Sequence, residues 1–345
     1  MLADCGLSDT ATPVPRARGT LESMTTFIVE RAEDGSISHR KEADPQAWLG
    51  EGELTINVSH SSLNYKDAMA LAGDKGVMRI SPLVPGIDAV GTTEDGTLVT
   101  CNGAGLGEFR HGGYTSLQRV PAEATVEVPQ CFSAEQAAAI GTAGYTAALC
   151  VNALLDHGLP PAEEAAPVLV TGATGGVGSI AVNLLSNLGY KVTALTGRQD
   201  ELGEYLSALG AQDVLDRAAF MDPGKPLQKA RFSGAVDTLG GTPLANVLSQ
   251  IQWGGVVAST GLASSPQLET TVMPFILRNV TLTGVNSVDA PRRYRGRAWE
   301  LLANHLDRDV LDGLTTTVTL DQVAEAGANL IEGRSHGRTV VTIDA

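Results

Sequence analysis

A glycine-rich turn between a strand and a helix constrains the fold of this chain more than any other feature. Residues 171–178 read Thr-Gly-Ala-Thr-Gly-Gly-Val-Gly, directly after the apolar run 168–171 and directly before a helical segment that reaches Leu188. Glycines let a backbone approach a pyrophosphate closely, and the free N–H groups and dipole of the next helix supply positive potential. The spacing and context predict a Rossmann dinucleotide-binding unit, with a helix–strand contact that binds no ligand as the alternative.

The next predicted strand bears on the choice between NAD and NADP. NAD enzymes usually place Asp or Glu near the end of this strand, where it binds the ribose 2′-hydroxyl. Here the strand ends Ala-Leu-Thr-Gly-Arg at 194–198, so Thr196, Gly197 and Arg198 occupy the tip without a carboxylate. A hydroxyl and a guanidinium can both donate to a 2′-phosphate. We predict NADP(H) as the cofactor; a solvated loop arginine is the alternative for Arg198.

Alternating strands and helices surround the turn. Apolar runs at 191–195, 214–215, 235–236, 256–258 and 280–285 lack polar alternation, and a helix is predicted over 200–209. This pattern is typical of a parallel sheet covered on both faces. Before it, short alternating segments from residue 25 to 129 predict a small barrel or sandwich, followed by a helix that begins at Ser133 and is interrupted at 141–144.

Composition excludes several classes of partner. The chain has 24 Lys and Arg against 39 Asp and Glu, a net charge of −15, which repels nucleic acid and anionic membranes. We find no apolar run near the about 20 residues that span a bilayer. The cysteines form no CxxC pair and have no His at metal-ligand spacing, so a reducing cytoplasm is expected; they are Cys5, Cys101, Cys131 and Cys150. Residues 1–23 lack periodicity and are expected to be a disordered leader.

Several segments together resemble one family. The chain from Met24 onward is similar to the zinc-independent medium-chain dehydrogenase/reductases, and among them to the YhdH/AcuI branch of NADPH-dependent acrylyl-CoA reductases, often labelled quinone oxidoreductases. The glycine turn is common to the superfamily, whereas the NYKD and MPFILRN stretches are specific to this branch. The resemblance rests on 61–68 (SSLNYKDA), 84–88 (VPGID), 141–147 (GTAGYTA), 171–178, 196–198 and 273–280 (MPFILRNV).

The resemblance implies an α/β fold of two domains. A GroES-like β-barrel catalytic domain would comprise residues 24–150 and 288–345, with a Rossmann NADP-binding domain, residues 151–287, inserted into it. The nicotinamide would sit between the two, and family members are typically homodimers. Alcohol-oxidising relatives carry a zinc-binding Cys where this chain has Asn64–Asp67 and a His-Glu pair where it has Ile87-Asp88. Without such ligands we expect no metal site, which favours reduction of an activated C=C bond over alcohol oxidation.

The implied reaction reduces acrylyl-CoA to propionyl-CoA. A hydride from NADPH would add to the β-carbon, charge would develop on the thioester oxygen, and a proton would reach the α-carbon. Tyr65 is the expected catalytic group and lines the cofactor site in the family, with Asn64 near the substrate. Whether Tyr65 donates the proton or only shapes the pocket stays open.

The remaining cofactor contacts are carried over position by position. The pyrophosphate would be held by the glycine turn, and Arg217 would lie near the adenosine phosphate. Three weaker assignments fall near the nicotinamide. The full set is Thr174, Gly175, Gly176, Val177 and Arg217, then Leu262, Ser287 and Arg338.

An arginine run stands out against the acidic background. Residues 291–297 read Pro-Arg-Arg-Tyr-Arg-Gly-Arg. Acyl-CoA carries several phosphate charges, so Arg292 and Arg293 are candidate substrate ligands; a solvated helix start with ordinary salt bridges is the alternative. Two other functions stay open. One is a quinone or 2-enal reductase with the same hydride step, and the other is a non-catalytic NADPH-binding protein.

Overall fold

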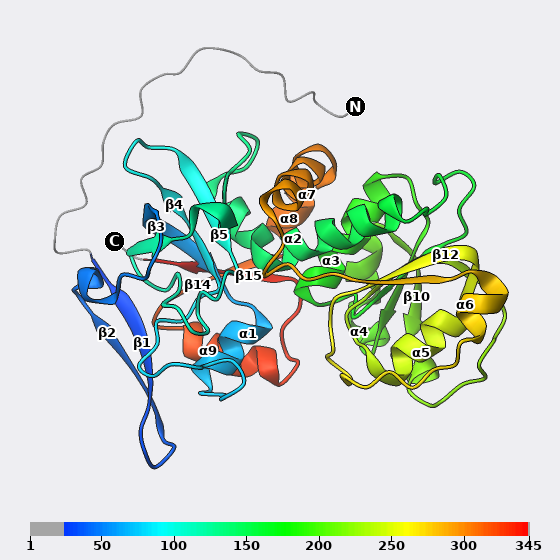
Figure 1. Cartoon of the computed structure of the whole chain (residues 1–345), viewed down its shortest axis with the longest axis horizontal. Helices are drawn as coiled ribbons and strands as arrows, with labels where there is room; N and C mark the ends of the chain where they lie inside the picture. Colours follow the sequence, from blue (N-terminus) through cyan, green and yellow to red (C-terminus); the bar gives the residue numbers. More distant parts are fainter. Residues whose placement is uncertain (1–23, 344–345) are drawn as a thin grey trace. The chain divides into compact units, whose positions relative to one another are not determined.

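The computed structural model describes residues 24–343, which divide into two compact units (Figure 1). Of the described residues, the first unit contains 24–138, Thr317–Ile331 and 340–343. The second contains Ala139–Thr316 and Glu332–Thr339. The limits predicted from sequence, at 150/151 and 287/288, stay a prediction, and the leader predicted at residues 1–23 lies outside the described residues.

The first unit is built on antiparallel strands. In the central strand β3 (Leu54–Ser62), buried Ile56 and Val58 alternate with exposed Asn57 and Ser59, as the sequence pattern predicts. β3 pairs antiparallel with β15 (Arg338–Thr342), β4 (Asp88–Thr92) and β6 (Leu117–Val120), and β1 (Thr26–Arg31) pairs antiparallel with β2 (Ile37–Glu42). The sheet runs β14 (Thr315–Thr319), β15, β3, β4, β5 (Leu98–Asn102), β7 (Thr125–Glu127), with β6 on β3; β1 and β2 form a separate hairpin.

Two helices of this unit pack against each other. They are α1 (Tyr65–Leu71) and α9 (Val323–Ile331). A Cβ at Gly327 would lie 3.0 Å from Leu71 Cδ1, so the absence of a side chain there permits the close approach. Short 3-10 helices lie at Pro45–Trp48 and Ala122–Ala124.

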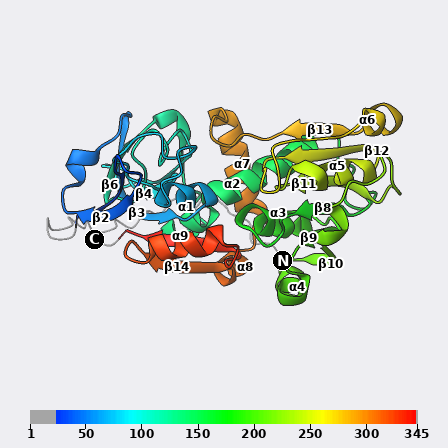
Figure 2. The same ribbon diagram turned by 90° about the horizontal axis from the view of Figure 1, so that it is seen from below.

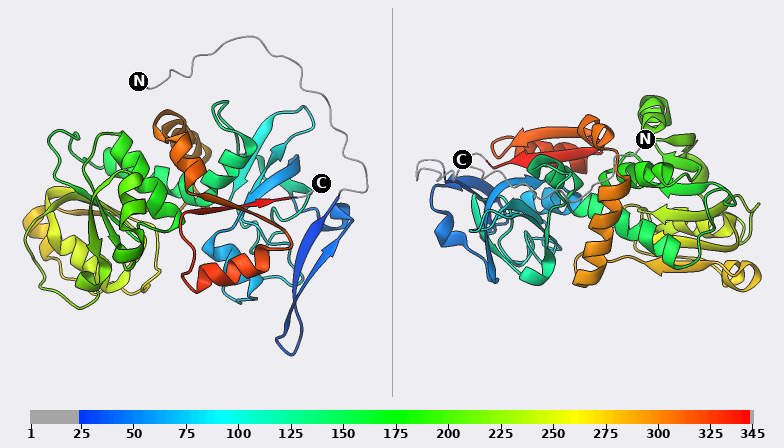
Figure 3. Two further views of the ribbon diagram at one scale, coloured as in Figure 1. Left: turned by 180° about the vertical axis from the view of Figure 1, so that it is seen from behind. Right: turned by 90° about the horizontal axis from the view of Figure 1, so that it is seen from above.

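The second unit is a six-stranded parallel sheet. Its order is β10 (Ala211–Asp216), β9 (Val192–Thr196), β8 (Val168–Thr171), β11 (Phe232–Asp237), β12 (Ile251–Ser259), β13 (Thr281–Gly284). Numbered along the chain this is 3-2-1-4-5-6, the doubly wound Rossmann order. Figure 2 shows the strands following one another, and Figure 3 shows them from the opposite side. The predicted fold class, a GroES-like β-domain with a Rossmann unit, is confirmed.

Helices and short turns connect these strands. β8, β9 and β11 are buried along their whole length, which explains why their sequences lack polar alternation. The connecting helical segments are α3 (Gly176–Asn187), α4 (Gln199–Ala208), the 3-10 helix Arg217–Phe220, α5 (Gly241–Gln250) and α6 (Met273–Arg278). Helices α7 (Arg292–His305) and α8 (Arg308–Gly313) follow the last strand, β13.

Helix α2 (Ala134–Asp156) corrects one expectation. It is interrupted at Gly141 (φ 46°, ψ −160°), where the sequence predicted an interruption. By length and composition alone it could cross a membrane, so the expectation that no apolar segment approaches that length is wrong. Most of its apolar stretch is buried inside the protein, as in a core helix, and burial accounts for its hydropathy.

Candidate functional site

The glycine turn (residues 171–178) is tight enough to require its glycines. Gly172 has φ 58°, and a Cβ at Gly178 would lie 2.4 Å from the Gly172 carbonyl oxygen. Gly175 is the N-cap of α3. The first N–H groups of a helix lack intrahelical partners, so this end of α3 presents donors and positive potential to an anion.

A segment far along the chain supports this turn. The return segment (residues 332–339) donates a hydrogen bond from Gly337 N to Thr174 O at 3.0 Å. Arg338 is buried, and its Nε donates to Ala139 O at 2.5 Å. Its Nη1 would lie 2.7 Å from a Cβ at Gly176. Arg338, expected near the nicotinamide end, therefore lies against the glycine turn.

Two guanidinium groups meet at the tip of β9. A Cβ at Gly197 would lie 3.1 Å from Arg217 Nη2, so that side chain covers the glycine. Arg198 Nη2 donates to Thr174 Oγ1 at 3.0 Å and to Ser335 O at 2.9 Å. Its Nη1 donates to a carbonyl of the return segment at 3.1 Å. The structure thus brings Thr174, Gly197, Arg198 and Arg217 together.

Thr196 is part of the same tip but faces inward. It is buried, and its Oγ1 accepts a hydrogen bond from Arg198 N at 3.1 Å. The hydroxyl therefore fixes the turn that presents Arg198.

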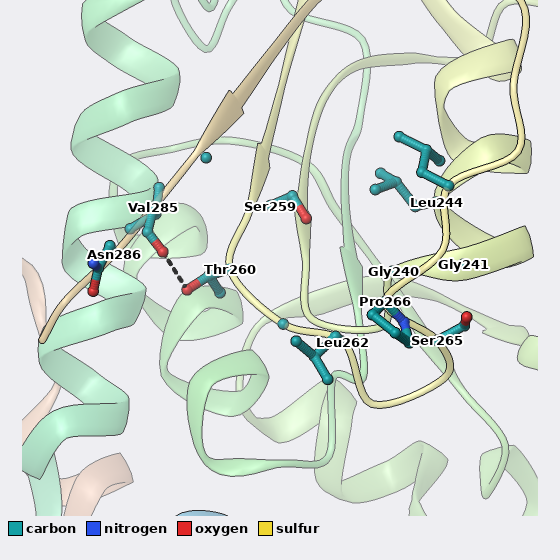
Figure 4. A pocket seen from close by; sticks show the side chains of 13 residues that line it. Gly240, Gly241, Leu244, Ser259, Thr260, Leu262, Ser265, Pro266, Val285 and Asn286 are labelled. Carbon is teal, nitrogen blue, oxygen red and sulfur yellow. Dashed lines mark hydrogen bonds between the residues drawn. The ribbon is translucent and has the colours of Figure 1, made fainter. Parts of the chain in front are cut away.

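A pocket of about 570 Å³ opens at the carboxyl ends of β12 and β13 (Figure 4). Thr260 Oγ1 donates to Val285 O at 3.0 Å across it. Ligands of doubly wound sheets bind at this edge. Of the pocket residues the sequence singled out only Leu262, which is 65% exposed; Ser287 follows the lining residue Asn286. The others are Gly240, Gly241, Leu244, Ser259, Thr260, Gly261, Ser265, Pro266, Leu268, Gly284 and Val285.

Tyr65 lies in the first unit, at the start of α1, and is 57% exposed. Asn64 caps this helix, and its N–H donates to Asp67 Oδ2 at 2.8 Å. Asn64 Nδ2 lies within 3.0 Å of oxygens of Ser62, Asp67 and Asp88. The residue expected to contact substrate thus uses its amide to hold the first turn of α1.

The carboxyls of Asp67 and Asp88 are fully buried. Burial, and then the charge of Asp88, raise the pKa of Asp67 to about 7. Ile87 N donates to Asp67 Oδ1 at 2.8 Å, and Asn102 Nδ2 donates to Asp88 Oδ1 at 2.7 Å. Beside them, Lys66 Nζ and Glu108 Oε1 form an ion pair at 2.8 Å.

The four arginines of the run 291–297 have different environments: one is buried, one forms an ion pair, and two are exposed without an ion pair to any described residue. Arg295 is buried, donates to Val288 O at 2.8 Å and lies over the ring of Tyr145. Arg297 makes two 2.9 Å bonds to the Asp156 carboxylate. Arg292 and Arg293 remain exposed at the start of α7.

Comparison with known proteins identifies the family. A family described as zinc-binding dehydrogenase matches residues 176–304. Acrylyl-CoA reductase AcuI of Ruegeria pomeroyi is 43% identical over 306 residues, which cover 86% of this chain and 92% of that protein. The chain belongs to the YhdH/AcuI branch of the medium-chain dehydrogenase/reductases. The resemblance inferred from the sequence is confirmed.

Solved structures of YhdH/AcuI relatives contain nicotinamide cofactors. YhdH of Salmonella enterica, crystallised with NADP, is 42% identical with a TM-score of 0.88, covering 93% of this chain and 100% of that one. YhfP of Bacillus subtilis, crystallised with NAD, is 38% identical with a TM-score of 0.86, covering 93% and 99%. Relatives of this chain have therefore been crystallised with either dinucleotide.

Within residues 24–343, no group of three or more His, Cys, Asp or Glu side chains is placed to hold a metal ion. The positions of Asn64 and Asp67 are taken up by the hydrogen bonds around α1.

Proposed function

We propose that this chain is an NADPH-dependent acrylyl-CoA reductase. The observation that carries the proposal is the 43% identity to AcuI of Ruegeria pomeroyi along nearly the whole of that protein. The Rossmann unit and its glycine turn agree with a dinucleotide-dependent oxidoreductase.

The residues at the β9 tip fit NADP(H). Arg198 and Arg217 flank Gly197, and neither forms an ion pair with a carboxylate among the described residues. Arg198 also donates to Thr174 and to two carbonyls of the return segment, so Arg217, whose guanidinium covers Gly197, is the main candidate to bind a ribose 2′-phosphate. We propose that residues 174–177 hold the pyrophosphate, with Leu262 and Ser287 toward the nicotinamide. When bound, NADPH would supply the hydride.

The protein's own part in the chemistry is orientation and proton delivery. Hydride addition to the β-carbon of an enoyl thioester leaves negative charge on the thioester oxygen and requires a proton at the α-carbon. We propose Tyr65 as the donor, because its hydroxyl is on an exposed side chain held by a tightly capped helical turn. General acids contribute about 100-fold or more. Tyr65→Phe should therefore lower kcat strongly, and a change within about twofold, worth ~0.4 kcal/mol, would remove the acid role.

We propose the residues that bind the substrate from the distribution of positive charge. Arg292 and Arg293 are exposed on α7, while Arg295 and Arg297 are already committed to carbonyls and to Asp156. Phosphates of coenzyme A suit the two exposed guanidinium groups. Asn64 stays a proposed substrate contact, although its amide nitrogen already bonds within the protein.

Three further features belong to the same proposal. We propose a zinc-independent enzyme that acts in the cytoplasm as a homodimer. Large apolar side chains lie exposed on α6 and on β12, beside the open sheet edge β13, which supports an interface between two copies. They are Trp253, Val272, Ile276 and Leu277.

One experiment decides between the candidate functions. NADPH oxidation is followed with acrylyl-CoA, crotonyl-CoA and a benzoquinone in parallel. We expect the highest kcat/KM for acrylyl-CoA. A higher value for the quinone would favour the second candidate, suggested by the provisional quinone oxidoreductase name of Bacillus subtilis YhfP. NADPH binding without turnover of any acceptor would indicate a non-catalytic NADPH-binding protein.

A further inference from the structure

A buried carboxylate at the middle of the Rossmann sheet has no part in the chemistry proposed above. Asp237 is the last residue of β11 and is 0% exposed. The strands on either side, β8 and β12, end at Thr171 and Ser259. Asp237 therefore lies where three neighbouring parallel strands reach the edge that binds ligands.

The carboxylate is satisfied by four donors from these strand ends. Oδ1 accepts from Thr171 Oγ1 at 2.8 Å and from Leu239 N at 3.3 Å. Oδ2 accepts from Gly240 N at 3.0 Å and from Ser259 Oγ at 3.2 Å. Among the described residues no Lys, Arg or His forms an ion pair with it, so neutral dipoles alone compensate the buried group. A buried carboxylate without a cation is costly, and its retention at this point needs a reason.

On one side, the network reaches the glycine turn. Thr171 Oγ1 also accepts from Thr238 N at 2.9 Å, and Thr238 Oγ1 donates to Thr171 O at 2.9 Å. A Cβ at Gly172 would lie 2.2 Å from Thr238 Oγ1. The end of β11 thus packs directly on the first residue of the turn.

On the other side, the network reaches the pocket. Gly240 and Ser259, two of the four donors, line it, and both are labelled in Figure 4. Gly240 has φ 66°, and a Cβ there would lie 2.5 Å from Ser265 O. Releasing the Gly240 N–H would therefore loosen a turn that forms the pocket wall.

We propose that Asp237 is a positioning residue that holds the glycine turn and the pocket in one fixed geometry, so that both ends of a dinucleotide can be bound at once. The role rests on the proposed NADPH-dependent function. Asp237 acts through Thr171, Gly240 and Ser259 and need not touch the cofactor. Loss of the network should weaken a ligand that spans turn and pocket more than a ligand that reaches the turn alone.

Asp237→Asn is the informative variant because it keeps the size of the side chain. The hydroxyls of Thr171 and Ser259 can rotate to accept from the new amide, but the N–H groups of Leu239 and Gly240 cannot. One backbone donor is therefore left facing another donor. Ser259→Ala is a milder second variant, which removes one donor without altering the carboxylate. Asp213→Asn, at an exposed position of β10, is the matched control.

The experiment compares two ligands on each protein. Dissociation constants are measured for NADPH, which spans the site, and for 2′,5′-ADP, which carries only the adenosine end, alongside thermal melting and NADPH kinetics. We expect Asp237→Asn to weaken NADPH at least tenfold and 2′,5′-ADP less than threefold. KM for NADPH should rise more than kcat falls. Ser259→Ala should weaken NADPH about threefold, and the control should match the wild type.

Three outcomes would overturn the role. NADPH binding by Asp237→Asn at wild-type strength is one. Equal weakening of both ligands with a lowered Tm is another, because it indicates a general loss of folding. If Asp237→Asn does not fold, unchanged NADPH binding by Ser259→Ala is the third. Wild-type protein that binds neither ligand would overturn the proposed cofactor, and this role with it.

Discussion

Two side chains beside Gly197 should set the cofactor preference. Arg217 covers Gly197, while Arg198 is bonded to Thr174 and to the return segment. Hydrogen bonds to charged groups are worth about 1.5–3 kcal/mol, or roughly 10- to 100-fold in binding. Arg217→Ala should therefore lower the preference for NADPH over NADH at least tenfold. Arg198→Ala should lower it too and, because it also loosens Thr174, weaken NADH.

Steady-state KM values for both coenzymes test this prediction. Arg231→Ala, at the position just before β11, serves as the control, since Arg231 lies over the ring of Phe232. If the double variant Arg198→Ala/Arg217→Ala keeps the wild-type preference, the assignment of this tip to the 2′-phosphate is wrong.

The buried carboxyl of Asp67 should make the free energy of unfolding depend on pH. Its folded-state pKa is about 7 against an ordinary value of 3.8, so between these pH values the folded protein holds a proton that the unfolded chain has released. The free energy of unfolding should therefore fall as pH rises from about 4 to 7 and level off above. Asp67→Asn should flatten this part of the profile in denaturant titrations. Parallel wild-type and variant profiles would contradict the prediction.

The roles of individual residues could be predicted where they depend only on neighbouring positions in the sequence. The order Thr-Gly-Arg at 196–198 shows in the sequence that β9 itself ends without a carboxylate, while the structure pairs Asp216 of β10 with Thr196. The inward direction of Thr196 and the contact of Arg338 with Gly176 were not predictable, because they depend on hydrogen bonds and on a segment distant in sequence.

At the scale of elements, α3 depends on its glycines. A Cβ at Gly178 would lie 2.4 Å from Gly172 O, whereas one at Gly203, in α4, would meet nothing within 4 Å. Gly178→Ala should lower the Tm and weaken NADPH binding. Gly203→Ala should raise stability by up to about 1 kcal/mol, the helix propensity difference between the two residues. Thermal melts and NADPH titrations of the pair test this, and equal effects of the two changes would refute the close packing.

Sequence patterns recovered the buried strands of the Rossmann sheet but missed a helix of the first unit. The apolar runs of β8, β9 and β11 and the break in α2 at Gly141 were predicted, because burial and glycine leave strong local signals. Helix α1 was missed. With seven residues it has little periodicity, and it is held by the hydrogen bonds of Asn64 and Asp67.

At the scale of the whole molecule, the exposed apolar group on α6 and β12 predicts association. Ile276 is 71% exposed and Trp253 75%. Burying such side chains between two copies removes apolar area from water. Light scattering should give twice the chain mass of 35.8 kDa for the wild type. Ile276→Asp should shift it toward the single-chain mass, and Met221→Asp, at another exposed apolar position, should not; a wild-type monomer would refute the prediction.

One sequence motif was enough to predict the Rossmann sheet, but not the segment near the C-terminus that packs on its glycine turn. A strand, a glycine turn and a helix indicated the doubly wound sheet. That residues 332–339 belong with the nucleotide unit was not predicted, because the bond from Gly337 to Thr174 joins positions with no shared local pattern.

That bond also has a consequence for biosynthesis. Thr174 leaves the ribosome 337 − 174 = 163 residues before its partner Gly337. At a translation rate of about 5–20 residues per second, roughly 10 to 30 s pass between the synthesis of Thr174 and that of Gly337. A polypeptide truncated before Gly337 would contain the whole glycine turn but lack the hydrogen bond that supports it. We therefore expect the nascent chain to bind the coenzyme only after Arg338 has been synthesised.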